Sequence, residues 1–113
     1  MRCRSCAPIP EEVRNVAGLL ERRFSVSVIW ASANGVTRFN EYVQVLEPIP
    51  PATLTARLTE LERAGILARL LIDDRPPRVE YRLTPFGESL KPVLLSLRDW
   101  GERHRAEVAA LRA

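Results

Sequence analysis

The apolar positions of residues 50–63 repeat at the spacing of an amphipathic helix. Leu54, Leu58 and Leu61 are four and three residues apart, which places them on one side of a helix. Gly65 follows, and glycine adopts the left-handed dihedrals of a helix end at little cost. The mostly apolar, partly β-branched run over residues 66–72 predicts a strand. The chain is therefore expected to pass from a helix through Gly65 directly into a strand.

A shorter amphipathic helix is predicted just before this one, with Thr37 as its N-cap. Its apolar positions recur at helical spacing and are Phe39, Tyr42, Val43 and Leu46. Residues 36–37 are a candidate short strand ahead of it. Residues 47–50 read Glu-Pro-Ile-Pro and predict a turn, because the residue before each proline is pushed out of the helical region. Helix, turn and helix thus follow one another as in a helix-turn-helix.

A β-hairpin is predicted after the longer helix. Val79, Tyr81 and Leu83 alternate with polar residues, which is the pattern of a second strand. Residues 73–77 are charged and proline-rich, and they form the expected hairpin tip. Thr84 is the expected cap of a last helix, with Pro85 at its first position.

The last helix is predicted over residues 85–113, and one long apolar stripe runs along it. The stripe comprises Leu90, Val93, Leu97, Trp100, His104, Val108 and Leu111. A stripe of this length on a terminal helix predicts a partner helix, which here would be a dimer contact. Pro92 is expected to kink the helix or to mark its true start, and Gly101 to weaken its middle.

The N-terminal third holds an arm, a first helix and an ambiguous segment. Residues 1–10 are an expected irregular arm, followed by a helix whose apolar face comprises Val13, Val16, Ala17 and Leu20. In residues 24–33, Phe24, Val26 and Val28 alternate with serines as in a half-buried strand. As a helix, the same segment would be apolar nearly all round and would have to be buried. Propensity favours the strand, and the pattern alone leaves both alternatives open.

Composition narrows the class of protein. A chain of 113 residues is expected to form one domain, and its net charge of +3 with a pI near 9.4 permits nucleic-acid binding without proving it. Every basic residue except Lys91 is an arginine, the side chain suited to phosphate and guanine recognition. No apolar run is long enough to span a membrane and no signal peptide is visible, so the expected compartment is the cytoplasm. We find no catalytic or cofactor motif and expect no enzyme activity.

Several segments together resemble the HxlR family of winged helix-turn-helix transcriptional regulators. They are Arg38-Phe39-Asn40-Glu41, residues 54–62 (LTARLTELE), residues 65–69 (GILAR), residues 76–84 (PPRVEYRLT), residues 87–93 (GESLKPV) and Trp100-Gly101. The resemblance covers nearly the whole chain. It implies a mainly α fold with a small β-hairpin wing, terminal helices that form a dimer interface, and a helix at residues 24–33. It also implies a homodimer that binds a DNA operator.

The chain departs from the family pattern at two places. It has Arg22-Arg23-Phe24 where the family usually has Gly-Lys-Trp. It has Pro50-Pro51-Ala52 where the recognition helix usually begins with a serine and a basic residue is common. A serine would both cap the helix and reach a phosphate. The alternative function is therefore a winged-helix module that has lost DNA binding and works through protein contacts.

The residues expected to contact DNA lie on three elements. They are Arg38, Thr53, Thr55, Ala56, Arg57, Thr59, Arg75 and Arg78. On the recognition helix, threonine and alanine can contact thymine methyls, and Arg57 can bind guanine or phosphate; the alternative is an ordinary solvated helix face. Arg75 and Arg78 either bind phosphate or the minor groove, or form surface ion pairs with Asp73 and Asp74. Arg38 is either a phosphate contact or a structural arginine at a helix start.

The remaining candidates are the cysteines and the dimer contacts. Cys3 and Cys6 are either a redox pair or incidental thiols, and with a single histidine they cannot complete a four-ligand zinc site. We therefore expect no metal and no cofactor. Val13 and Leu20 of the first helix join the stripe of the last helix in the predicted dimer interface, where His104 serves as an interface histidine.

Overall fold

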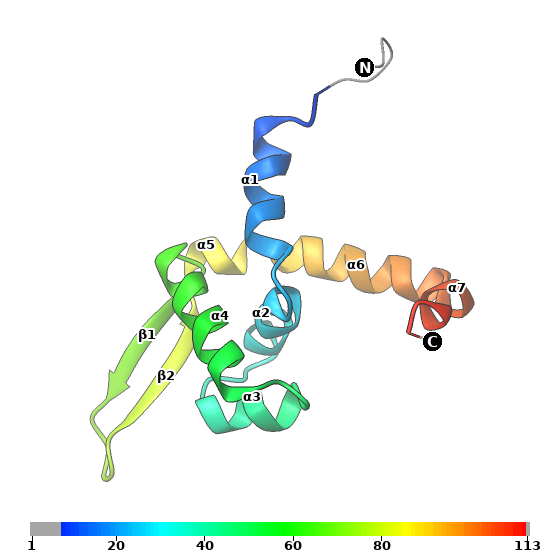
Figure 1. Ribbon diagram of the computed structural model, residues 1–113. Helices are drawn as coiled ribbons and strands as arrows, with labels where there is room; N and C mark the ends of the chain where they lie inside the picture. The colour runs from blue at the N-terminus through cyan, green and yellow to red at the C-terminus, as the bar shows by residue number, and fades with distance from the viewer. Residues whose placement is uncertain (1–7, 113) are drawn as a thin grey trace.

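The structure is a computed structural model that describes residues 8–112. Its elements in chain order are α1 (Glu11–Leu20), α2 (Ser25–Ala33), α3 (Phe39–Val45), α4 (Pro51–Arg63), β1 (Leu67–Ile72), β2 (Arg78–Leu83), α5 (Pro85–Glu88), α6 (Lys91–Arg103) and α7 (Arg105–Ala110). Helices α2, α3 and α4 form a central body, with the hairpin on one side, α6 on the other and α1 projecting above (Figure 1). The predicted fold class, mainly α with a hairpin wing, is confirmed. None of the helices within residues 8–112 is long and apolar enough to cross a lipid bilayer.

Helix α2 lies at the centre of the core. Val28 and Ile29 are fully buried, and α1, α3, α4 and β2 all contact this helix. The prediction of a strand over residues 24–33, which rested on propensity, is therefore wrong. The helix implied by the family resemblance is confirmed. The physical reason is burial, because a helix covered on most sides can be apolar nearly all round whatever its local propensity. Phe24 precedes the helix in a left-handed conformation, with φ of 73°.

The predicted stripe of α4 packs into the same core. Leu54, Leu58 and Leu61 are at most 1% exposed, and burying each such side chain contributes about 1.5–3 kcal/mol. The buried Tyr42 of α3 places its hydroxyl 2.6 Å from the Ser32 hydroxyl, so its polar end is satisfied inside the core. This packing fixes which side of α4 faces outward.

Helix α3 begins one residue later than predicted. Its N-cap is Arg38 and not Thr37. The Glu41 carboxylate accepts hydrogen bonds from the backbone N–H groups of Arg38 at 3.0 Å and Thr37 at 3.3 Å, and thus caps the helix from within. These N–H bonds and the nearby Arg38 charge lower the pKa of Glu41. Residues 36–37 form no strand, but the Thr37 carbonyl accepts a hydrogen bond from Tyr81 of β2 at 2.8 Å. The start of α3 is thereby fastened to the wing.

The wing is a two-stranded antiparallel hairpin in the predicted place. Its register runs from Leu67 opposite Leu83 to Ile72 opposite Arg78. Gly65 has φ of +79°, as expected for the residue that ends α4, and Leu67 is buried at the base of the hairpin. The strands therefore extend from the core to an exposed tip at residues 73–77.

The C-terminal segment differs from the single helix predicted over residues 85–113. Thr84 caps a helix as expected, since its Oγ1 accepts from the Gly87 N–H at 3.0 Å, but this helix, α5, ends at Glu88. Pro92 marks the true start of α6, one of its two predicted roles. Helix α6 ends at Arg103, soon after Gly101, and His104 separates it from α7. The predicted stripe is therefore divided between helices.

Candidate nucleic-acid interface

The outward face of α4 carries small side chains followed by one arginine. Opposite the buried leucines lie Ala52, Ala56, Thr59 and Arg63, and the exposed Thr55 lies beside Thr59 on the flank. The Oγ1 atoms of Thr55 and Thr59 donate to the Pro51 and Thr55 carbonyls at 3.1 and 2.8 Å. Because the hydroxyl hydrogens are used within the helix, each threonine offers a methyl group and an acceptor oxygen. Predicted contacts Ala56 and Thr59 are thus on the outward face, whereas Thr55 and Thr53 lie on its two flanks, Thr55 exposed and Thr53 half-buried.

One feature of this helix was missed by sequence reasoning. Ala52 is exposed where its spacing placed it, opposite the leucines, but Arg57 is not on that face. Arg57 is only 14% exposed, and its Nε donates to the Arg23 carbonyl at 2.8 Å. Its Nη1 donates to Glu60 at 2.6 Å, and Glu60 also lies 3.7 Å from the Arg22 guanidinium. Arg57 therefore connects α4 to the segment between α1 and α2, a role outside both alternatives considered for it.

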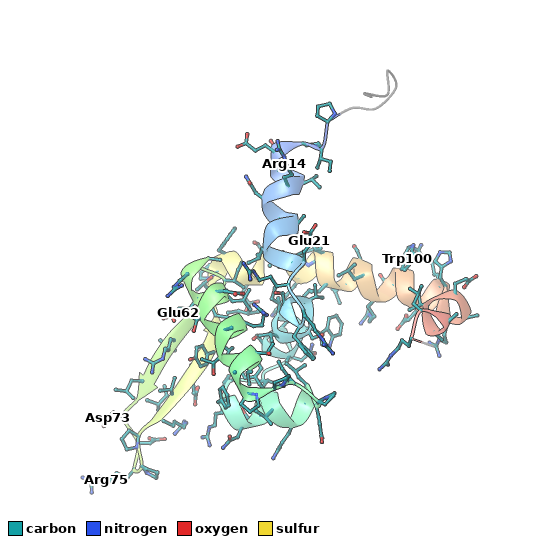
Figure 2. The ribbon with its side chains drawn as sticks, in the orientation of Figure 1. Arg14, Glu21, Glu62, Asp73, Arg75 and Trp100 are labelled. Atoms are coloured by element: carbon teal, nitrogen blue, oxygen red, sulfur yellow. The ribbon has the colours of Figure 1, made fainter. Side chains whose placement is uncertain are left out.

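An arginine-lined concavity lies between the start of α3 and the wing. An open space of about 460 Å³ is lined by Arg38, Asp74, Arg75, Pro76 and Arg78. The structure thus brings together three predicted contacts from two separate parts of the chain. Arg75 lies at the far end of the hairpin, near Asp73, while Trp100 lies on the other side of the molecule (Figure 2). Within residues 8–112, Arg75 makes no ion pair, which leaves its charge available.

Arg78 is oriented by two carboxylates. It pairs with Asp74, and its Nε donates to Glu80 at 2.7 Å. Glu80 also accepts two hydrogen bonds from Arg82, at 3.0 and 2.7 Å, and is only 4% exposed because these arginines cover it. Hydrogen bonds from Arg78 and Arg82 hold the pKa of Glu80 below its ordinary value. The ion-pair alternative is therefore realised for Arg78 with Asp74, but not for Arg75.

Most of the predicted dimer residues are exposed, but three are only partly exposed. Leu20 and Leu90 pack against the molecule's own core, because they stand where α1 and α6 join the body. Val108 is half-buried. The exposed members are Val13, Val93, Leu97, Trp100, His104 and Leu111. The Trp100 and His104 rings lie 5.1 Å apart.

An apolar groove adjoins these exposed residues. It has a volume of about 370 Å³ and lies between α2 and α6. Val26, Ser27, Trp30, Leu94, Leu97 and Arg98 line it. Helix α1 carries a second apolar surface, in which Val13 and Val16 are 54% and 47% exposed and no residue is buried. The redox candidates Cys3 and Cys6 lie outside the described residues.

Comparisons with known proteins agree with this fold. A family model described as HxlR-like helix-turn-helix matches residues 19–109. The uncharacterised HTH-type transcriptional regulator YdeP of Bacillus subtilis is 42% identical over 80 residues, which are 71% of this chain and 62% of YdeP. The matched segment thus spans less than two thirds of that relative.

Solved structures give a similar result. The redox regulator HypR in its reduced form superposes with a TM-score of 0.80 at 32% identity, over 88% of this chain and 99% of HypR. Its oxidised form gives a TM-score of 0.75 at 34% identity, over 81% and 95% of the two chains.

Proposed function

The chain belongs to the HxlR family of winged helix-turn-helix transcriptional regulators, and from this we propose that it works as a homodimer that binds a pseudo-palindromic operator in double-stranded DNA. In this proposal α4 enters the major groove, and the wing lies on the phosphate backbone or in the minor groove. We place this activity in the cytoplasm, because the operator is part of the chromosome.

The concavity between α3 and the wing carries the proposal. Arg38, Arg75 and Arg78 line it from two separate parts of the chain, so a phosphate entering there would meet three guanidinium groups and one carboxylate, Asp74, which is already paired with Arg78. Arginine binds phosphate with two parallel hydrogen bonds and fixes its orientation. Such contacts set the register of a protein on the duplex, while the exposed face of α4 is left to meet the bases.

Two unpartnered apolar surfaces support the dimer. The exposed valines of α1 and the groove between α2 and α6 both lack cover within the described chain. In a symmetric dimer each surface can cover its counterpart on the other protomer. This arrangement would present two α4 helices to major grooves about 34 Å apart, one turn of DNA.

Arg75→Ala is expected to weaken binding to all DNA sequences about equally. Each phosphate contact releases counterions, so removing one should lower the slope of log affinity against log salt by about one. Fluorescence anisotropy with operator and unrelated DNA at several salt concentrations measures this slope. Arg105→Ala is the matched control, because Arg105 lies on α7, far from the wing (Figure 1).

The same titration separates this function from its alternative. Binding that is insensitive to salt would contradict a phosphate-based interface. If the wild type bound no DNA at any salt concentration, the chain would instead be the protein-interaction module suggested by Pro50-Pro51-Ala52.

We also propose that the regulator responds to thiol oxidation. Cys3 and Cys6 precede α1, and Arg2 and Arg4 flank Cys3. Neighbouring positive charge favours the thiolate, the reactive form of cysteine. The similar structure of HypR, named a redox regulator, supports this idea. A disulfide could join Cys3 to Cys6 in one protomer, or link the N-terminal arms of the two protomers. As it forms, the two thiols pass two electrons and two protons to an oxidant. The bond would change the start of α1 and hence the dimer.

Cys6→Ser is expected to abolish any effect of diamide on operator binding. Diamide accepts the two electrons and two protons, so wild-type protein should show a disulfide on non-reducing gels and an altered operator affinity. Cys3→Ser is the companion variant and tests whether Cys6 pairs with Cys3 or with its copy in the other protomer. Identical binding by oxidised and reduced wild type would show that the cysteines are not the sensor.

A further inference from the structure

We propose that α4 reads its operator through contacts with thymine methyl groups and makes no guanine contact in its N-terminal half. The base pairs beneath that half would then be A·T pairs. This inference rests on the proposed DNA-binding function, and it follows from what the outward face of α4 presents.

The donors that read guanine are absent from the N-terminal part of this face, residues 52–59. Guanine presents two acceptors, O6 and N7, in the major groove, and arginine or lysine is their common partner. Ala52 and Ala56 have no donor, and the hydroxyl hydrogens of Thr55 and Thr59 are directed to carbonyls of α4 itself.

Arg57 cannot supply the missing donor without leaving its partners. Its guanidinium is bonded to the Arg23 carbonyl and to Glu60, and only 14% of the side chain is exposed. Withdrawing it would leave the Arg23 carbonyl and the Glu60 carboxylate without these bonds. Its position on the flank of α4 also turns it away from the outward face.

The two ends of α4 do not change this conclusion. At the start, Pro50 and Pro51 have no backbone N–H to offer. At the other end, Arg63 is exposed on the outward face, but it lies in the last turn of the helix. Recognition helices contact base edges with their N-terminal residues, so Arg63 would face the backbone rather than the bases.

The face is instead matched to thymine. Ala52, Thr55, Ala56 and Thr59 present four methyl groups over about two turns. The C5 methyl of thymine is the apolar group of the major groove, and removing it from water against alanine or threonine methyls is favourable. The threonine Oγ1 atoms remain acceptors, which suits the N6 amino group of the paired adenine.

The test uses full-length protein and DNA in which single thymines are replaced by uracil. A high-affinity site is first selected from a random duplex library. Each thymine of one half-site is then replaced by uracil, which removes only the C5 methyl, and affinity is measured by anisotropy at one salt concentration. We expect a loss of about three- to fivefold at the thymines under α4, the effect of one buried methyl group.

Protein variants assign these thymines to α4. Thr55→Ser and Thr59→Ser keep the hydroxyl and remove the methyl, and each should erase the thymine–uracil difference at its own base pair. Thr84→Ser is the control, because it keeps the hydroxyl that caps α5 and removes a methyl outside α4, so it should leave the thymine–uracil differences unchanged. Thr59→Arg adds a donor to the outward face and should shift the selected base toward guanine.

Each outcome has a distinct meaning. Equal affinity for thymine and uracil at every position, with salt-dependent binding intact, would overturn the inference and leave the proposed function standing. Selection of a guanine whose contribution disappears in Arg57→Gln would overturn it as well. Absence of any salt-dependent DNA binding would remove both the inference and the proposed function.

Discussion

Leu97→Glu is expected to yield monomers that bind the operator about 10²–10⁴-fold more weakly than wild type, the advantage that linking two binding modules provides. Leu97 is 49% exposed on α6 and lines the groove between α2 and α6. A glutamate there leaves the monomer's core intact. In the proposed dimer it would bury an unpaired charge, which is strongly unfavourable.

Multi-angle light scattering gives the mass, and anisotropy gives the operator affinity. Leu71→Glu is the control, because Leu71 is 72% exposed on the wing, away from the groove. It introduces the same charge and should leave the mass of the dimer unchanged. Leu97→Glu protein that remained dimeric at the same concentration would refute the assignment of this groove to the dimer interface.

Gly87→Ala is expected to lower the free energy of unfolding by about 3 kcal/mol, at the upper end of the effect of overpacking. A Cβ atom at Gly87 would lie 2.2 Å from the Ile66 carbonyl oxygen and 2.9 Å from a Leu83 methyl. The Ile66 carbonyl cannot easily move, because it accepts the Thr84 N–H at 3.0 Å where the wing meets α5.

Thermal and urea unfolding followed by circular dichroism measure this loss. Gly18→Ala is the matched control, since a Cβ at Gly18, in α1, has no neighbour within 4 Å. That substitution should be neutral or should stabilise the protein by up to about 1 kcal/mol, through helix propensity. A Gly87→Ala variant as stable as wild type would show that the corner of wing and α5 can yield.

Local chemistry explains why much of the fold could be predicted from the sequence. The leucine stripe of α4, the left-handed Gly65 and the Thr84 cap each depend on residues within a few positions of one another. The helix at residues 25–33 could not be predicted from its own pattern, because its stability comes from the elements that surround it. Only the family resemblance predicted it correctly.

The interface was less predictable, for a related reason. The partner of Arg57 is a backbone carbonyl at Arg23, 34 residues earlier in the chain, and no spacing rule connects the two. Similarly, Leu90 has the spacing of the exposed stripe but packs inward, where the chain turns from α5 into α6. Helical periodicity identifies a face, but only the tertiary contacts decide what covers it.

The bond between Arg57 and the Arg23 carbonyl has a consequence for how this regulator can change its target. One side of α4 holds the scaffold together, while Ala52, Thr55 and Thr59 take no part in the core. Substitutions at these three positions can therefore accumulate by drift or be introduced by design without a large penalty in folding. Retargeting by directed evolution should begin from libraries at these positions with Arg57 left unchanged.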